Sequence, residues 1–171
     1  YVLCNNCMHL NGIHEDSDNF CNNIYNEDEI SYDETYSSKD KETYMYRLSS
    51  VYQPKAEFLY STLLEEKNPN QLSYLDFGAG SGYFVGALKS IGLDKISGLE
   101  VSEKQVNYAN KMLGVNLLNH HNYKETNKVL QATKSNVVSM IGVLEHLQDP
   151  RGALKAIKEN LSTLSDLNFS L

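Results

Sequence analysis

The sequence lacks the features that mark several classes of protein. No apolar run approaches the ~18 residues of a membrane-spanning helix, and no signal-like apolar stretch is present. Lysine and arginine do not cluster, so the chain has no linear stretch of positive charge to neutralise nucleic-acid phosphates. We therefore expect neither a membrane nor a nucleic-acid partner, and we expect a cytoplasmic protein with reduced thiols.

The negative charge is concentrated in one segment. Residues 15–42 hold ten acidic and two basic side chains, a local charge of −8 in a chain whose net charge is −7. The rest of the chain is therefore close to neutral. Because Asp16 to Asp40, within this segment, is also poor in branched apolar residues, it is predicted to be a loosely structured connector. At 171 residues without an initial methionine, the chain is expected to be one domain with an appendage, lacking its natural N-terminus.

A glycine turn stands between a short apolar segment and a helical one. Leu72 to Phe77 is typical of a buried strand, and Tyr83 to Ile91 has helical spacing. Between them lie Gly78, Gly80 and Gly82, where a Cβ would take the space of a ligand and where some positions need positive φ. A strand, a glycine turn and a helix in this order bring bare main chain against a ligand at a helix N-terminus.

The spacing of the acidic residues and glycines narrows the choice of ligand. A dinucleotide fingerprint would need glycine at position 83, which is Tyr83. The pattern is instead acidic-x-G-x-G-x-G, with Asp76 as its acid. A second predicted strand, Lys95 to Leu99, ends in Glu100, whose carboxylate could accept hydrogen bonds from both hydroxyls of a ribose.

A third motif follows a predicted strand over Val137 to Ile141. Val143 to Pro150 reads V-L-E-H-L-Q-D-P, and Asp149 with Pro150 predicts the start of a helix that ends near Leu161. Together the three motifs resemble those of the class I S-adenosylmethionine-dependent methyltransferases, over residues 72–161. The resemblance implies an α/β fold, a Rossmann-like sheet with helices on both faces. Only four of the seven strands of that fold are readable, so we expect the chain to be incomplete at its C-terminus.

The resemblance also implies a set of cofactor-binding residues for S-adenosylmethionine. Asp76 would attract the methionyl ammonium, although hydrogen bonding to the N–H groups of the turn is an alternative role. Glu100 would bind the ribose; its alternative is a solvated cap on the next helix. The full expected set is Asp76, Gly78, Gly80, Gly82, Glu100, Val101, Gly142 and Leu144. Adenine recognition has the weakest support, because residues 119–122 contain no acidic side chain.

Two residues of the third motif are candidate catalytic groups. His146 could accept a proton from a hydroxyl or carbon nucleophile, with Glu145 beside it at the mouth of the cleft. The alternative is that both residues start a turn and bond to backbone. Tyr32, Tyr36 and Tyr44, which precede the first strand of the sheet, could help cover the cofactor or the substrate, although ordinary surface packing is the expected role for any one of them.

The N-terminus carries a possible zinc knuckle. Cys4 and Cys7 form a C-x-x-C pair, which can supply two corners of a tetrahedral site, with His9, His14 or Cys21 as further ligands. The segment resembles half of the zinc ribbon that precedes some C-methyltransferases of nucleotide-linked sugars. The alternative is a pair of reduced cysteines in a turn. We expect residues 1–42 to form an N-terminal extension, irregular or zinc-knuckle-like, and residues 43–171 the methyltransferase domain.

Local signals predict two further details. Pro54 is expected to separate a helix that ends near Tyr52 from one that begins at the proline. Ser102 and Gln105 are expected to form a reciprocal capping box.

The sequence thus favours methyl transfer to a small-molecule acceptor, which would be a nucleotide-linked sugar if the knuckle binds zinc. Two other classes stay open: a non-catalytic scaffold or zinc-knuckle binding module, and a dinucleotide-dependent oxidoreductase, which Tyr83 opposes. The acceptor atom and the oligomeric state are not indicated by any motif.

Overall fold

The computed structural model describes residues 1–12, 17, 19–20, 23, 40–64, 71–115, 117–119 and 126–161. Most of the acidic connector, with Tyr32 and Tyr36, and residues 162–171 lie outside these ranges. The elements in chain order are β1 (Val2–Leu3), β2 (Leu10–Asn11), α3 (Lys41–Arg47), η2 (Leu48–Tyr52), α4 (Gln53–Leu64), β3 (Tyr74–Phe77), α5 (Tyr83–Ser90), β4 (Ile96–Glu100), α6 (Glu103–Leu113), β5 (Leu118–Asn119), α7 (Thr126–Thr133), β6 (Val137–Ser139), η5 (Leu144–His146) and α8 (Pro150–Asn160).

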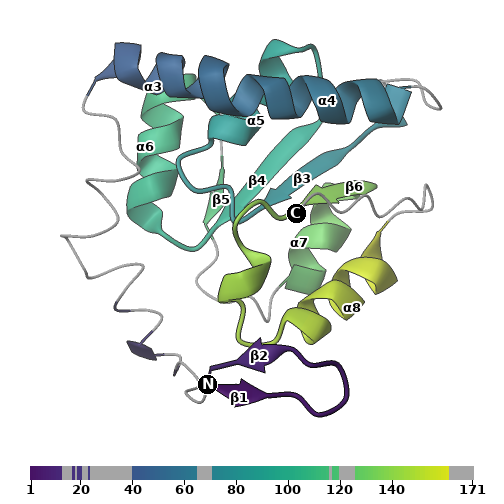
Figure 1. The fold of residues 1–171 in the computed structure, drawn as a ribbon. Helices are drawn as coiled ribbons and strands as arrows, with labels where there is room; N and C mark the ends of the chain where they lie inside the picture. Colours follow the sequence, from purple (N-terminus) through teal and green to yellow (C-terminus); the bar gives the residue numbers. More distant parts are fainter. Residues whose placement is uncertain are drawn as a thin grey trace.

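Four parallel strands form the central sheet in the order β5-β4-β3-β6 (Figure 1). The chain adds strands outward from β3 to β5 and then returns to place β6 on the other side of β3. In open parallel sheets, ligands bind beyond the carboxyl ends of the strands at such a reversal. This order, with helices between the strands, confirms the predicted Rossmann-like α/β fold.

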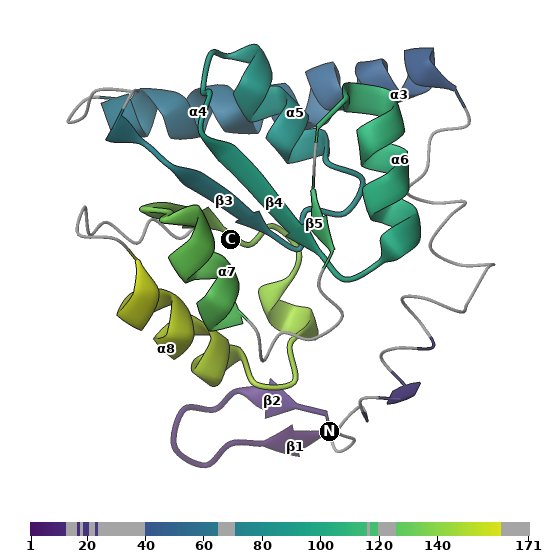
Figure 2. The same ribbon diagram turned by 180° about the vertical axis from the view of Figure 1, so that it is seen from behind.

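Helices cover both faces of the sheet. Figures 1 and 2 show α4, α5 and α6 on one side and α7 with α8 on the other. Alternate residues of β3 point to the two sides: Tyr74 packs in the cluster that includes α5, and Leu75 and Phe77 pack in the cluster with α7 and α8. Asp76 therefore lies on the same face as Tyr74, beneath α5 and the helices that precede it.

One continuous run of helical backbone comprises α3, η2 and α4, so the predicted helix break at Tyr52 is wrong. The middle segment is a π-helix in which the Gln53 N–H bonds to the Leu48 carbonyl, five residues back. This wider turn opens the hydrogen-bond ladder just before Pro54. It thereby accommodates a ring that would clash with the carbonyl four residues back in a regular α-helix.

The predicted helix ends are largely confirmed. Asp149 caps α8 by accepting from the Gly152 N–H at 2.8 Å, with Pro150 at the first helical position. The end of α6 is at Gly114, which has φ of +62°. The strand that follows, β5, covers only Leu118–Asn119, although the side chains of Val115 and Leu117 before it are also buried.

The N-terminal residues form a two-stranded antiparallel hairpin, β1–β2, with Cys4 and Cys7 in its turn. Within the described part of the chain, no helix combines the length and the apolar character that crossing a membrane requires.

Candidate cofactor site

The glycine turn lies at the carboxyl end of β3. The N–H groups of Gly78 and Ala79 both donate to the Leu99 carbonyl of the neighbouring strand, at 2.8 and 2.9 Å. Gly78, Gly80 and Gly82 have φ of +74°, +53° and +75°, so all three occupy the left-handed region that favours glycine. The sequence anticipated positive φ at some of these positions.

The three glycines are required for different steric reasons. A Cβ at Gly78 would lie 2.3 Å from a methyl of Val143, and one at Gly82 would lie 2.9 Å from the Cβ of Ala109. A Cβ at Gly80 would meet no atom of the described residues within 4 Å. The expectation that each glycine leaves room for a ligand is therefore wrong for Gly78 and Gly82, whose space is taken by protein. At Gly80 the main chain borders space that the described residues leave open, and room for a ligand there stays a prediction.

Glu100 lies at the end of β4 and holds the glycine turn directly. It is 8% exposed, and its two carboxylate oxygens accept from the N–H groups of Gly80 at 2.8 Å and Ser102 at 2.9 Å. Burial raises the pKa of Glu100, while these backbone donors lower it. The alternative of a solvated cap is wrong because the side chain is buried. A carboxylate has about four acceptor sites, so two backbone bonds leave capacity for ribose hydroxyls.

Half of the predicted capping box is also wrong. Ser102 does accept from the Gln105 N–H, at 3.4 Å. The Gln105 side chain, however, accepts from the hydroxyl of Ser81 in the glycine turn and does not return to Ser102. The Ser102 N–H is bonded to Glu100, so no donor remains there for Gln105.

Asp76 is a second buried carboxylate at the carboxyl end of the sheet. It is 3% exposed, and the Ser139 hydroxyl of β6 donates to it at 2.5 Å. Burial raises the pKa of Asp76 to about 7, the Ser139 hydrogen bond opposes the increase, and the nearby charge of Glu100 adds to it. The alternative role for Asp76 was to accept hydrogen bonds from the N–H groups of the turn. At Gly80 that acceptor is Glu100 and not Asp76.

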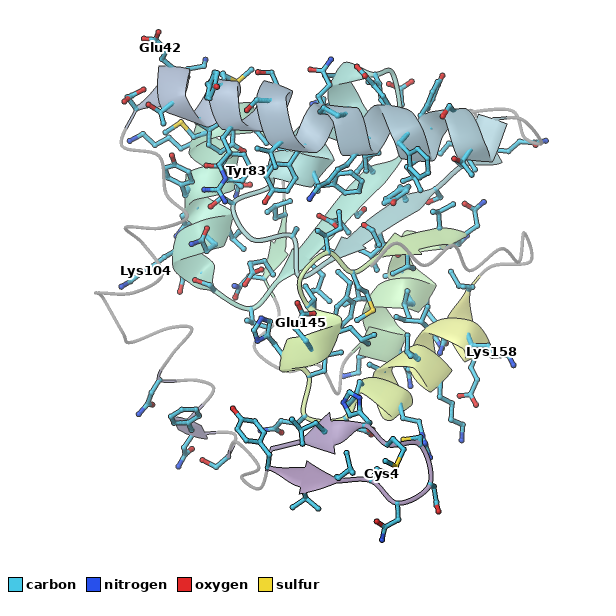
Figure 3. The ribbon with its side chains drawn as sticks, in the orientation of Figure 1. Cys4, Glu42, Tyr83, Lys104, Glu145 and Lys158 are labelled. Atoms are coloured by element: carbon cyan, nitrogen blue, oxygen red, sulfur yellow. The ribbon has the colours of Figure 1, made fainter. Side chains whose placement is uncertain are left out.

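The third motif places its residues at the same end of the sheet. Gly142 has φ of +65° and is exposed, and Val143 is buried against Gly78. Glu145 and His146 lie exposed on η5, near the carboxyl ends of β3 and β4 in both ribbon views, and Figure 3 labels Glu145 there. The backbone N–H of His146 donates to the Val143 carbonyl at 2.9 Å, as expected if Glu145 and His146 start a turn. The side chains of Glu145 and His146 are nevertheless exposed.

An aromatic group from the helices before β3 covers the turn, and sequence reasoning missed its arrangement. The Tyr83 ring is stacked between Tyr44, at a centroid distance of 4.3 Å, and Tyr52, at 5.1 Å. The Arg47 guanidinium lies 5.3 Å above the Tyr83 ring. The signal was available, because Tyr44, Leu48 and Tyr52 recur at helical spacing and would mark one face once the helix is known to be continuous.

Tyr44 is too deeply buried to cover the cofactor or substrate directly, so of its two suggested roles packing is the one that applies, in the core and not at the surface. Its side chain is 0% exposed, and its hydroxyl donates to the Ser81 carbonyl at 2.7 Å. Tyr52 is hydrogen-bonded to Arg47. Burial raises the pKa of Tyr52, the charge of Asp76 adds to the increase, and Arg47 opposes it. Arg47 and Asp76 therefore both act on the same tyrosine.

The cysteine pair is only half of a possible metal site. The N–H groups of Cys7 and Asn6, together with the Cys7 side chain, lower the pKa of the Cys4 thiol, which favours the thiolate. Among the residues that the structure describes, no three His, Cys, Asp or Glu side chains gather as metal ligands. His14 and Cys21, the other candidate ligands, are not among the described residues.

The expected adenine region is described only in part. His120 and His121 lie outside the described residues. Asn119 is described, and its side-chain amide donates to the carbonyls of Glu100 and Val101.

Several solved methyltransferases share this fold. The plantazolicin methyltransferase BpumL, solved with a pentazolic desmethylPZN analog and SAH, is 22% identical with a TM-score of 0.54; the match covers 77% of this chain and 52% of that one. SAM-bound CalS10, an amino pentose methyltransferase from Micromonospora echinaspora, is 15% identical (TM-score 0.53; 73% and 53% covered). An S-adenosylmethionine-dependent methyltransferase from Clostridium acetobutylicum ATCC 824 is 16% identical (TM-score 0.56; 75% and 55% covered).

The chain thus spans about half the length of these solved structures. No curated protein sequence matches it. A family model described as a methyltransferase domain matches residues 48–168, which is more than half of the chain and includes the glycine turn, Glu100 and the third motif. The chain therefore belongs to the methyltransferase domain family and has the class I, Rossmann-like fold.

Proposed function

We propose that this chain binds S-adenosylmethionine and transfers its methyl group to a small molecule. One observation carries the proposal. At the carboxyl ends of β3 and β4, the space above Gly80 that the described residues leave open lies near two buried carboxylates, Asp76 and Glu100. A ligand with one cationic group and one diol fits this arrangement, because each buried carboxylate has spare acceptor capacity.

Each carboxylate has a distinct proposed role. Glu100 would bind the ribose hydroxyls while keeping its bond to the Gly80 N–H, and Asp76 would face the methionyl ammonium. Val101, Gly142 and Leu144 would border the rest of the cofactor. When bound, S-adenosylmethionine supplies an activated methyl group, so the protein has to position the acceptor and exclude water.

His146 is the proposed general base, and Glu145 its neighbour at the acceptor side. Both side chains are exposed, as a residue that meets an incoming acceptor must be. Replacing His146 by alanine is expected to leave affinity for S-adenosylhomocysteine unchanged in calorimetry. Methyl transfer should fall by about 10²–10⁴-fold, the usual contribution of a positioned base. Unchanged turnover in this variant would remove the catalytic role and leave the turn role.

The finer proposal is a nucleotide-linked sugar as acceptor, with zinc at the N-terminal knuckle. Cys4 and Cys7 would supply two thiolates, and the lowered pKa of Cys4 suits a metal ligand. Two more ligands would have to come from outside the described residues. Elemental analysis of the protein and of a Cys4→Ser, Cys7→Ser variant tests this, because one zinc per chain should be present in the first and absent in the second.

Arg47 is a further proposed cofactor contact, on the carboxylate of the methionyl group. It is held over Tyr83, the residue that follows the glycine turn, and it shares Tyr52 with Asp76. Arg47→Gln is expected to weaken binding of S-adenosylhomocysteine by about tenfold, as loss of a charge-assisted hydrogen bond does. Binding of decarboxylated S-adenosylhomocysteine should not change. Equal losses for the two ligands would contradict a contact with the carboxylate.

Calorimetry with S-adenosylmethionine, S-adenosylhomocysteine and NAD separates the proposal from its alternatives. Binding of NAD alone would favour an oxidoreductase. Tight binding of S-adenosylhomocysteine without turnover of any acceptor would favour a non-catalytic scaffold.

A further inference from the structure

The glycine turn needs anchors from outside its own sequence. Three of its five residues are glycines, and a glycine peptide can rotate between negative and positive φ at little cost. A ligand that packs against the main chain of the turn requires that main chain to be ordered in advance, since any ordering on binding reduces affinity. The question is therefore which side chains fix the peptide planes between Gly78 and Gly82.

Consecutive residues of the turn are tied to three different elements. The Gly80 N–H donates to Glu100 at the end of β4, and the Ser81 hydroxyl donates to Gln105 of α6. The Ser81 carbonyl accepts from the hydroxyl of Tyr44, which lies 37 residues earlier on α3.

The Tyr44 bond acts on a particular peptide plane. The carbonyl of Ser81 and the N–H of Gly82 belong to one peptide group, and that N–H donates to the Ala79 carbonyl at 2.9 Å. Rotation of this plane would break both bonds at once. Because Gly82 offers little resistance to rotation by itself, the Tyr44 hydroxyl supplies the constraint from the far side of the turn.

The Tyr44 side chain is itself rigidly held. It is fully buried, stacks on Tyr83 and meets the edge of the Tyr108 ring at a centroid distance of 5.7 Å. Burial raises the pKa of Tyr44, so its hydroxyl keeps its proton and remains a donor at physiological pH. A buried side chain in contact with two other rings, with its one polar atom directed at a carbonyl, fits a positioning role.

We propose that Tyr44 is a positioning residue for cofactor binding, whose hydroxyl fixes the Ser81–Gly82 peptide and thereby presents the glycine turn to the ligand. The identity of the ligand, S-adenosylmethionine, rests on the proposed function. The orientation of the turn by Tyr44 does not depend on which ligand binds.

The test is Tyr44→Phe, which removes the hydroxyl and keeps the stacked ring. Affinity for S-adenosylhomocysteine in calorimetry is expected to fall about two- to tenfold, the range set by one net hydrogen bond. Without ligand, amide hydrogen exchange should accelerate at Gly80 and Gly82 but not in β3. In Tyr46→Phe, a matched change at an exposed tyrosine of the same helix, neither measurement should change.

A second control separates positioning from general stability. Leu93→Ala creates a cavity in the same core cluster away from the turn, and it should lower the melting temperature without weakening affinity. Unchanged affinity and unchanged exchange in Tyr44→Phe would overturn the proposal, as would equal losses of affinity in Leu93→Ala. A wild-type chain that binds no S-adenosylhomocysteine contradicts the proposed function, and exchange at Gly82 then decides whether Tyr44 orients the turn.

Discussion

Gly80→Ala is expected to abolish detectable binding of S-adenosylhomocysteine while the domain stays folded. Within the part of the chain that the structure describes, a Cβ at this position meets no atom within 4 Å, so it would project into the space assigned to the ligand. The stability cost should be confined to holding alanine at φ of +53°, about 1–2 kcal/mol. Calorimetry and thermal unfolding of the same sample measure the two effects.

Two other glycines provide matched controls. Gly92 has φ of +92°, and an added Cβ there also meets no described residue within 4 Å, but it lies at the end of α5 away from the site. Gly92→Ala should therefore cost similar stability and leave affinity unchanged. Gly78→Ala should destabilise the fold much more, because its Cβ would overlap Val143. If Gly80→Ala bound the ligand as tightly as Gly92→Ala does, the space above Gly80 would not be the cofactor site.

Asp76→Asn is expected to stabilise the unliganded protein at pH 8 and to weaken cofactor binding. The pKa of Asp76 is raised from 3.8 to about 7 by burial. Below pH 3.8 the folded and unfolded states both bind the proton. Between pH 3.8 and about 7 only the folded state holds it, so the free energy of unfolding falls as pH rises, by up to ~4 kcal/mol at pH 8. Asparagine carries no charge, so in Asp76→Asn the free energy of unfolding should not fall in this way as the pH rises.

Thermal unfolding between pH 4 and pH 8 measures the effect. The two proteins should melt at similar temperatures at pH 4, and Asp76→Asn should melt several degrees higher at pH 8. Asp94→Asn, at an exposed position, should follow the wild type. Because asparagine cannot pair with the ligand ammonium, Asp76→Asn should bind S-adenosylhomocysteine at least about tenfold more weakly at pH 8. Parallel unfolding profiles would contradict a buried, ionising Asp76.

Sequence patterns predicted the features that depend on neighbouring residues. The strand before Gly78, the helix after Gly82 and the cap at Asp149 were predicted correctly, because their chemistry lies within a few residues. The Rossmann-like sheet with helices on both faces followed from the resemblance to a known family.

The contacts that complete the site join residues distant in sequence, and no local pattern encodes them. Ser139 meets Asp76 across 63 residues, and Tyr44 meets Ser81 across 37. The helix break at Pro54 was predicted wrongly because a π-turn can accommodate proline. Sequence spacing also did not show that Glu100 bonds the Gly80 N–H, since that bond requires β3 and β4 to be paired in register.

The most direct test is a crystal structure of the protein with S-adenosylhomocysteine. We expect both ribose hydroxyls within hydrogen-bonding distance of Glu100, the methionyl chain against Gly80, and its ammonium on the side of Asp76. A ligand bound elsewhere, or a Glu100 side chain turned away from the ribose, would contradict the convergence of bare main chain and buried carboxylates on one adenosyl ligand.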